Sequence, residues 1–367
     1  MSDLEAVKLR EKYTHFRILV IGRANAGKTT LLKRVCNTDD DPCIYNENGE
    51  NQLEPSDERG IHDIEKQFVF KSNPQFIFHD SPGFEAGNEQ ELKDVLSFVE
   101  KRSKMNNPNE QLHAIWFCFV LNASRPLLEL EQKFFNEQRA GNVPVIAVFT
   151  KFDDLVAQLY DRDREEESRT DASKVVKEKF EMPLENSRDR PKAYVCFEAL
   201  DDSEGDHQEQ VKGLIEKTAA SLDDLALKML FVSVQRNNLE LCIKYAIYEQ
   251  NDLGHSSENV VYWAASWFRH CMYNSPTWTA FAAILICLES SFWYFDQNIG
   301  FQPAFEQAWK TFAHSDAKKR VEQDISTLIM ARATTSLNQK LTEQQKVTFF
   351  NIILQNRLEH PDAQDIF

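Results

Sequence analysis

A phosphate-binding motif directly follows an apolar strand near the start of the chain. Residues 18–21 are Ile-Leu-Val-Ile, an unbroken apolar run typical of a strand buried on both faces of a parallel sheet. Gly22 comes next, and four residues later the chain continues with Gly27, Lys28 and Thr29, which completes the spacing G-x-x-x-x-G-K-[ST]. This motif is specific when a strand precedes it and a helix follows it. The stretch therefore predicts a nucleotide-binding α/β domain.

The chemistry of phosphate binding accounts for each part of this loop. Glycine lets backbone N–H groups turn toward phosphate oxygens, the Lys28 ammonium neutralises the outer phosphates, and the Thr29 hydroxyl can ligate Mg²⁺. The helix expected next, running to about Thr38, adds the positive end of its dipole. We therefore expect the phosphates of a nucleotide to lie against the whole loop, which consists of Gly22, Arg23, Ala24, Asn25, Ala26, Gly27, Lys28, Thr29 and Thr30.

A second nucleotide signal closes a later strand. The apolar stretch at residues 76–78 is followed by His79 and then by Asp80-Ser81-Pro82-Gly83. At the end of a strand, the Asp80 carboxylate can hold Mg²⁺ through water, and the Gly83 N–H can meet a terminal phosphate. The four-residue pattern is weak alone, but its place some fifty residues after the phosphate loop makes it informative.

A third motif selects the base. Thr150-Lys151-Phe152-Asp153 follows an apolar strand at residues 143–149. A carboxylate at Asp153 can accept hydrogen bonds from both N1–H and the 2-amino group of guanine, whereas adenine offers neither donor. Lys151 is expected to pack over the base plane. The alternative, a simple helix cap, stays open at this point.

A weaker fourth signal follows the last expected strand. Residues 192–197 have strand character and lead into Glu198-Ala199-Leu200. At this place a guanine-binding domain offers a backbone N–H to the base oxygen, and Ala199 is the candidate. We include Glu198 and Ala199 in the expected nucleotide site.

The order of the elements predicts an α/β fold followed by helices. We expect a P-loop domain with a mostly parallel six-stranded sheet flanked by helices, with residues 37–60 forming a long polar, mobile loop. Beyond residue 222 only helical spacing of apolar residues is found, including one long helix over 225–247. The expected division is a lead-in at 1–15, a nucleotide-binding G domain at 16–221 and an α-helical C-terminal domain at 222–367.

Composition narrows the possible partners. The net charge of −16 argues against nucleic acid and anionic membranes as partners. The 7 cysteines are odd in number and contain no CxxC pair, which indicates free thiols in a reducing compartment, and we expect a cytoplasmic protein.

Aromatic residues cluster between 260 and 312. They favour a helix–helix core, with a partner groove or a membrane-surface face as alternatives.

The ordered set GRANAGKT, DSPG, TKFD and EAL resembles GTPases of the Era-like and septin-like group within the translation-factor class. The resemblance covers roughly residues 14–220. The whole chain, with its helical tail, also resembles uncharacterised G-domain-containing proteins of fungal genomes. These resemblances imply a domain that binds GTP and GDP with Mg²⁺, and they make dimerisation through the nucleotide face an expectation.

Three positions bear on catalysis in this family pattern. Phe84 follows Asp-x-x-Gly where signalling GTPases place a water-orienting Gln, which implies slow hydrolysis. Asn25 matches an Asn that ligates K⁺ in the group, although its backbone geometry is an equally good explanation. The first switch normally supplies a Thr to Mg²⁺, but no Thr occurs between Thr38 and Gly60, which leaves Ser56 as the substitute.

The sequence therefore predicts a slow GTPase, stimulated by K⁺ or by dimerisation, with a helical region that binds an unknown protein partner. The expected catalytic residues are Lys28, Asn25 and Gly83, and the expected metal ligands are Thr29, Asp80 and Ser56. Three alternatives remain: a non-hydrolysing interaction module in which the nucleotide is structural, an ATPase of the same fold, and a membrane-remodelling protein.

Overall fold

The computed structural model describes most of an α/β region and parts of a helical region. Its internal contacts divide the chain into two units, Lys12–Lys228 and a second unit of Met1–Glu11 with Met229–Phe367. The residues described are 12–45, 64–81, 89–137, 142–160, 165–202, 207–234 and 301–332, with a few single residues in 5–9, 245, 282–287 and 348–356.

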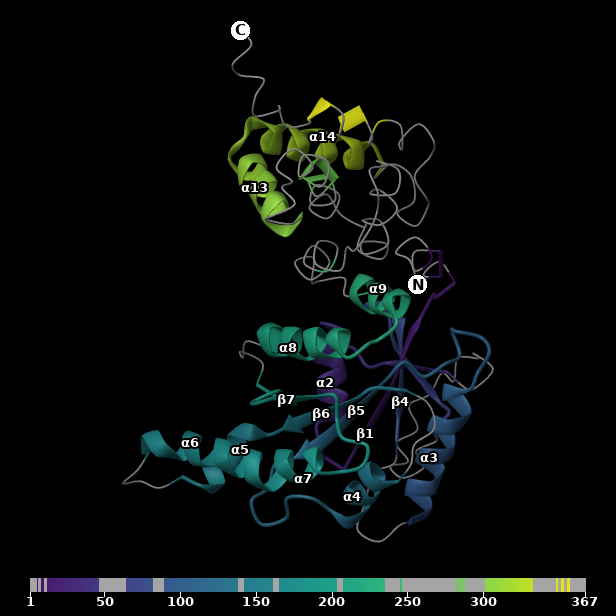
Figure 1. The fold of residues 1–367 in the computed structure, drawn as a ribbon, viewed down its shortest axis with the longest axis vertical. Coiled ribbons are helices and arrows are strands. Elements are labelled where there is room, and N and C mark those ends of the chain that lie inside the picture. Colours follow the sequence, from purple (N-terminus) through teal and green to yellow (C-terminus); the bar gives the residue numbers. More distant parts are fainter. Residues whose placement is uncertain are drawn as a thin grey trace. The chain divides into compact units, whose positions relative to one another are not determined.

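A seven-stranded sheet forms the centre of the first unit (Figure 1). Its order is β2-β3-β4-β1-β5-β6-β7, and β4, β1, β5, β6 and β7 run parallel. Only β2 and β3 extend it antiparallel at one edge. The bounds are β1 Phe16–Gly22, β2 Cys43–Tyr45, β3 Gln67–Phe70, β4 Asn73–Asp80, β5 Ala114–Val120, β6 Val145–Thr150 and β7 Ala193–Cys196.

The prediction of six strands is wrong by one, because β2 lies within the stretch expected to be a polar loop. Its three residues are too few to show a period in the sequence. They become a strand through antiparallel pairing with β3, in which Cys43 lies opposite Val69 and Tyr45 opposite Gln67. The rest of that loop, residues 46–60, lies outside the described part of the chain.

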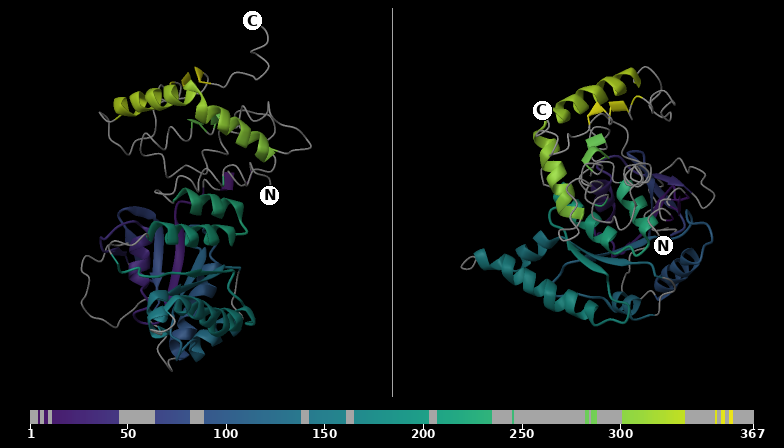
Figure 2. Two further views of the ribbon diagram at one scale, coloured as in Figure 1. Left: turned by 90° about the vertical axis from the view of Figure 1, so that its left-hand side faces the viewer. Right: turned by 45° about the horizontal axis from the view of Figure 1, so that its top comes forward.

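Helices cover both faces of the sheet (Figures 1 and 2). The helices α2 and α8 lie together on one face, where Trp116 Nε1 of β5 donates to Thr218 Oγ1 of α8 at 3.1 Å. The opposite face carries α3, α4 and the run from α5 to α7. The bounds are α2 Lys28–Val35, α3 Glu89–Ser103, α4 Glu129–Asn136, α5 Phe152–Gln158, α6 Glu165–Val176, η1 Lys177–Glu181, α7 Met182–Glu185 and α8 His207–Ala220.

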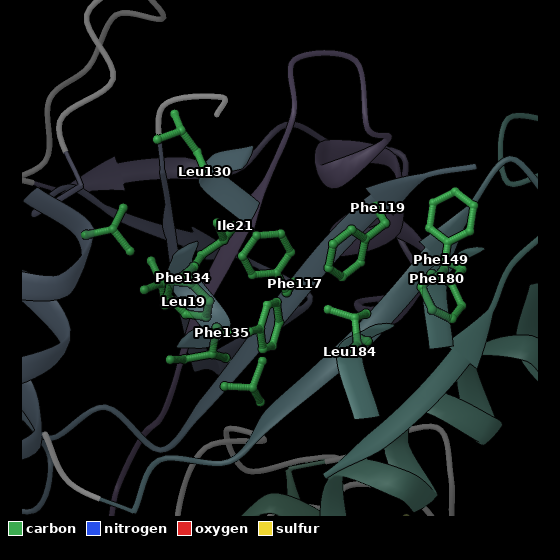
Figure 3. Close-up of a cluster of buried hydrophobic side chains, with 14 of the residues drawn as sticks. Leu19, Ile21, Phe117, Phe119, Leu130, Phe134, Phe135, Phe149, Phe180 and Leu184 are labelled. Atoms are coloured by element: carbon green, nitrogen blue, oxygen red, sulfur yellow. The ribbon is translucent and has the colours of Figure 1, made fainter. Parts of the chain in front are cut away.

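The α3–α7 face has an aromatic core (Figure 3). Phe117 of β5 stacks on Phe119 at 4.6 Å between ring centroids and contacts Phe134 and Phe135 of α4 at 5.1 and 5.2 Å. These rings are fully buried. Alternate side chains of β5 thus bury one apolar layer against α4.

The second unit is described mainly by its helices. The helix α13 (Phe301–His314) and the helix α14 (Asp316–Arg332) contact each other. The helix α9 (Leu225–Ser233) starts within the residues of the first unit and ends well before the expected end of a 225–247 helix. Most of the aromatic cluster predicted between 260 and 312 lies outside the described residues. Among the helices that the structure describes, none is long and apolar enough to cross a membrane.

The carboxyl end of β1 approaches β5 so closely that only glycine fits. A Cβ atom at Gly22 would lie 2.4 Å from the carbonyl oxygen of Cys118, its register partner on β5. We expect Gly22→Ala to lower the stability of the full chain by about 2–3 kcal/mol, because a rigid backbone atom must move. Thermal or urea denaturation measures this loss.

Gly213 provides the matched control for this substitution. It lies within α8, and a Cβ there would meet no atom within 4 Å. Gly213→Ala should therefore raise stability by about 0.5–1 kcal/mol through helix propensity. Equal effects of the two substitutions would contradict the steric account of Gly22.

Candidate nucleotide-binding site

The phosphate loop lies between the end of β1 and the first turn of α2. Two of its residues have left-handed backbone conformations, Asn25 with φ 59° and Gly27 with φ 71°. Gly27 is the N-cap of α2, and a Cβ there would meet nothing within 4 Å. Glycine is therefore favoured at this position by the left-handed backbone angle and not by lack of space. Asn tolerates this conformation better than most residues, which explains Asn25 without testing a K⁺ ligand role.

Lys28 joins the phosphate loop to the end of β4. Its ammonium Nζ donates to the carbonyl oxygens of Gly22 and Arg23 at 3.2 and 3.3 Å. It also lies 3.7 Å from Oδ1 of Asp80, with side-chain exposures of 11% and 18% for the pair. The predicted phosphate-binding cation and the predicted metal-binding carboxylate are thus brought together by the parallel pairing of β1 and β4.

Burial keeps two neighbouring titratable groups neutral. The thiol of Cys118 behind the loop has its pKa raised to about 12 by burial. The imidazole of His79, next to Asp80, has its pKa lowered to about 3 by burial and by the nearby Arg17 cation. Neutral His79 pairs with the Arg17 guanidinium through Nε2 and with the Ile64 carbonyl through Nδ1, both at 2.8 Å. These two groups therefore add no charge next to the Lys28–Asp80 pair.

The base-selecting motif lies at the ends of β6 and β7. The Thr150 hydroxyl donates to the Phe119 carbonyl at 3.1 Å, and Lys151 adopts a left-handed conformation (φ 60°) as the N-cap of α5. Oδ1 of Asp153 accepts the backbone N–H of Ala199 at 2.8 Å. Two segments that are 46 residues apart, both predicted to contact the base, thus meet in the structure.

Contacts from three elements hold the loop after β7. Arg169 of α6 donates a hydrogen bond of 3.1 Å to the Glu198 carboxylate and has a second ion-pair contact with it at 2.9 Å, and this pairing raises the pKa of the guanidinium. The Glu198 N–H donates to Gln210 Oε1 of α8 at 2.9 Å. Arg34 of α2 donates to the carbonyl of Leu200 at 3.0 Å. The side chain of Glu198 therefore supports the loop that presents Ala199.

Some of the predicted site residues lie in parts that the structure does not describe. These are Ser56, Gly83 and the neighbouring Phe84. The remaining expected positions gather at the carboxyl edge of the parallel strands, where open α/β sheets bind ligands. The phosphate residues come from β1 and β4, and the base residues from β6 and β7.

Sequence reasoning missed Glu131 of α4. This carboxylate has no exposed side-chain area and binds Arg23 of the phosphate loop with two contacts of 2.7 Å. The two residues are 108 positions apart, and Glu131 belongs to no nucleotide motif. The available signal was its place three residues after Leu128, the spacing of a helix capping box, but Leu is not a capping residue.

Part of the chain is similar to a known protein family. Residues 17–151 match the family described as 50S ribosome-binding GTPase. A solved structure described as a probable GTP-binding protein EngB is 19% identical, covers 55% of this chain and 97% of its own length, and gives a TM-score of 0.33. No curated protein matches the chain. The family match begins just before the phosphate loop, includes Asp80 and ends at Lys151 of the base-selecting motif.

Proposed function

We propose that this protein binds GTP and GDP with Mg²⁺ and hydrolyses GTP slowly to GDP and phosphate. The observation that carries the proposal is that groups suited to phosphate and groups suited to guanine lie along the same edge of the sheet. Lys28 and Asp80 lie 3.7 Å apart at the phosphate end, and Asp153 and Ala199 are joined at the base end. A guanine nucleotide offers phosphates to Lys28 and brings Mg²⁺ to Asp80. Its base offers two hydrogen-bond donors to Asp153.

The residues at the phosphate end fit Mg²⁺. This ion prefers oxygen ligands and is commonly held by one or two protein oxygens together with phosphates and water. The Thr29 hydroxyl in the first turn of α2 and the Asp80 carboxylate supply such oxygens, with Ser56 as the proposed third. Bound Mg²⁺ would neutralise charge on the phosphates during transfer.

Within this mechanism the chain's own residues position and neutralise charge. Lys28 leaves the loop carbonyls and binds the outer phosphates, while Asp153 orients the nucleotide by its base. Gly83 contributes its N–H to the terminal phosphate. Phe84 cannot hold the attacking water by hydrogen bonding, so the proposed turnover is slow, and K⁺ bound near Asn25 is the proposed stimulant.

A non-hydrolysing interaction module is the second candidate. Phe84 and the missing Thr of residues 39–60 favour it, because both remove groups that act on the terminal phosphate. In this case the nucleotide stabilises the domain, and the helical region at 222–367 binds a protein partner. Coupling of nucleotide state to that region, and dimerisation through the nucleotide face, belong to the first proposal.

Phosphate release by the full chain in KCl and in NaCl tests the proposal. We expect slow, Mg²⁺-dependent release from GTP that K⁺ accelerates, with the acceleration lost in Asn25→Ala because its side-chain oxygen is removed. GDP binding is measured alongside, with ADP as competitor. Binding without any release in either salt would favour the interaction module, and equal competition by ADP would contradict the choice of guanine.

A further inference from the structure

The side chain of Arg23, a residue of the phosphate loop, binds α4 and the segment that precedes it. Its Nε donates to Oε1 of Glu131 and its Nη2 donates to Oε2, each at 2.7 Å. This two-point geometry is available to Arg but not to Lys. The Arg23 side chain is 14% exposed, and that of Glu131 is fully buried.

The remaining donors of Arg23 bind the segment that precedes α4. Its Nη1 donates to the carbonyl of Arg125 at 3.1 Å, and its Nη2 donates to the carbonyl of Pro126 at 2.8 Å. Glu131 in turn accepts the backbone N–H of Leu128 at 2.7 Å. One buried ion pair thus connects the phosphate loop with the start of α4 and with the chain leading into it.

The backbone of Arg23 holds the phosphate loop from the other side. Its carbonyl accepts the N–H of Ala26 at 3.2 Å, which closes the turn of the loop, and it accepts the ammonium of Lys28 at 3.3 Å. Any displacement of Arg23 therefore changes the turn and the position of the phosphate-binding cation together.

A buried carboxylate is costly unless it is fully paired, and a fully paired polar network favours one geometry. In the described part of the chain, Glu131 accepts hydrogen bonds from Arg23 and from the backbone at the start of its own helix. The pair therefore restrains the phosphate loop in the apo protein. A loop restrained in advance loses less conformational entropy when it binds phosphate.

We infer that Arg23 and Glu131 form a clamp that positions the phosphate loop, so that Glu131 controls nucleotide affinity without touching the nucleotide. The inference rests on the proposed function, since it concerns binding of the same GTP and GDP. It assigns Arg23 a positioning role through its side chain, beyond the backbone contact expected from the motif.

The dissociation rate of fluorescently labelled GDP from the full chain, with the melting temperature of the apo protein, tests the clamp. We expect Glu131→Gln to accelerate dissociation about tenfold or more, since small displacements of positioning groups have effects of up to about 100-fold. Arg23→Lys keeps the charge but loses the two-point contact and should also accelerate dissociation. Glu129→Gln is the matched control on α4, because the Glu129 side chain is 81% exposed and pairs with Lys133 at 3.0 Å.

The double variant Arg23→Met with Glu131→Leu separates positioning from stability. Replacing a buried ion pair by apolar residues commonly restores stability. We expect the melting temperature to recover toward that of the unsubstituted chain while GDP dissociation stays fast. The clamp would be overturned, and the proposed function left intact, by either of two results. One is recovery of both the melting temperature and slow GDP dissociation in the double variant, and the other is unchanged dissociation in Glu131→Gln and Arg23→Lys. Absence of GDP binding by the unsubstituted chain would overturn both.

Discussion

Asp153→Asn should weaken GDP binding by about 100-fold or more, which corresponds to roughly 3 kcal/mol. In the structure Oδ1 of Asp153 accepts the Ala199 N–H at 2.8 Å, and an Asn oxygen can keep this bond. The substitution therefore changes mainly the second oxygen, which becomes an NH₂ donor. Guanine presents donors at N1 and at the 2-amino group. The Asn NH₂ group would therefore face a guanine N–H donor at the position where the carboxylate oxygen accepts a hydrogen bond.

Affinities for GDP, IDP and ADP, measured by calorimetry, resolve this effect. Inosine lacks the 2-amino group, so the unsubstituted chain should bind IDP more weakly than GDP, and Asp153→Asn should remove most of that difference. Asp154→Asn is the matched control, because the Asp154 side chain is exposed and lies next to Asp153 in the first turn of α5. If Asp153→Asn bound GDP as tightly as the unsubstituted chain, Asp153 would hold the Ala199 loop without recognising the base.

The arrangement of the site was predictable where the sequence carries both a motif and its strand. Asp80 and Lys28 are close because each follows a strand of a parallel pair, and parallel strands end at the same edge. Asp153 and Ala199 meet for the same reason on β6 and β7. A motif at the end of a buried parallel strand therefore predicts where its residues lie in the fold as well as what they bind.

The Arg23–Glu131 pair was not predictable from such patterns. Glu131 is one acidic residue in an amphipathic helix, and the usual expectation for it is solvent exposure. Its burial follows from the packing of Phe134 and Phe135 against β5, which sets the rotation of α4. Helical spacing places Glu131 three and four residues before these two Phe residues, on the same face of α4, but it does not show that Arg23 lies opposite that face.

The edge strand β2 escaped prediction for a related reason. A three-residue strand has no measurable period, and its conformation depends on a partner that lies more than twenty residues later. Pairing of Ile44 with Phe68 supplies that partner. Long, buried central strands such as β5 were predictable because burial on both faces leaves an unbroken apolar run in the sequence.

Lys28→Ala should reduce GTP affinity by about 100-fold or more and abolish measurable GTP turnover. Lys28 is the cation of the phosphate loop, and its removal also leaves the Asp80 carboxylate, now 3.7 Å from the ammonium, to repel the incoming phosphates. The loss should be larger for GTP than for GDP, because the Lys contacts the outer phosphates. Equilibrium binding of both nucleotides and phosphate release measure these effects.

Lys33→Ala is the control, since Lys33 lies on the same helix α2 but pairs with the exposed Asp41 at 2.7 Å. An exposed pair of this kind contributes little to stability, so nucleotide binding by Lys33→Ala should match that of the unsubstituted chain. If Lys28→Ala bound GTP as tightly as Lys33→Ala, the phosphate site would lie elsewhere. Equal losses for GTP and GDP would instead place the Lys28 ammonium on the inner phosphates, and its contribution would then be to binding and not to the transfer step.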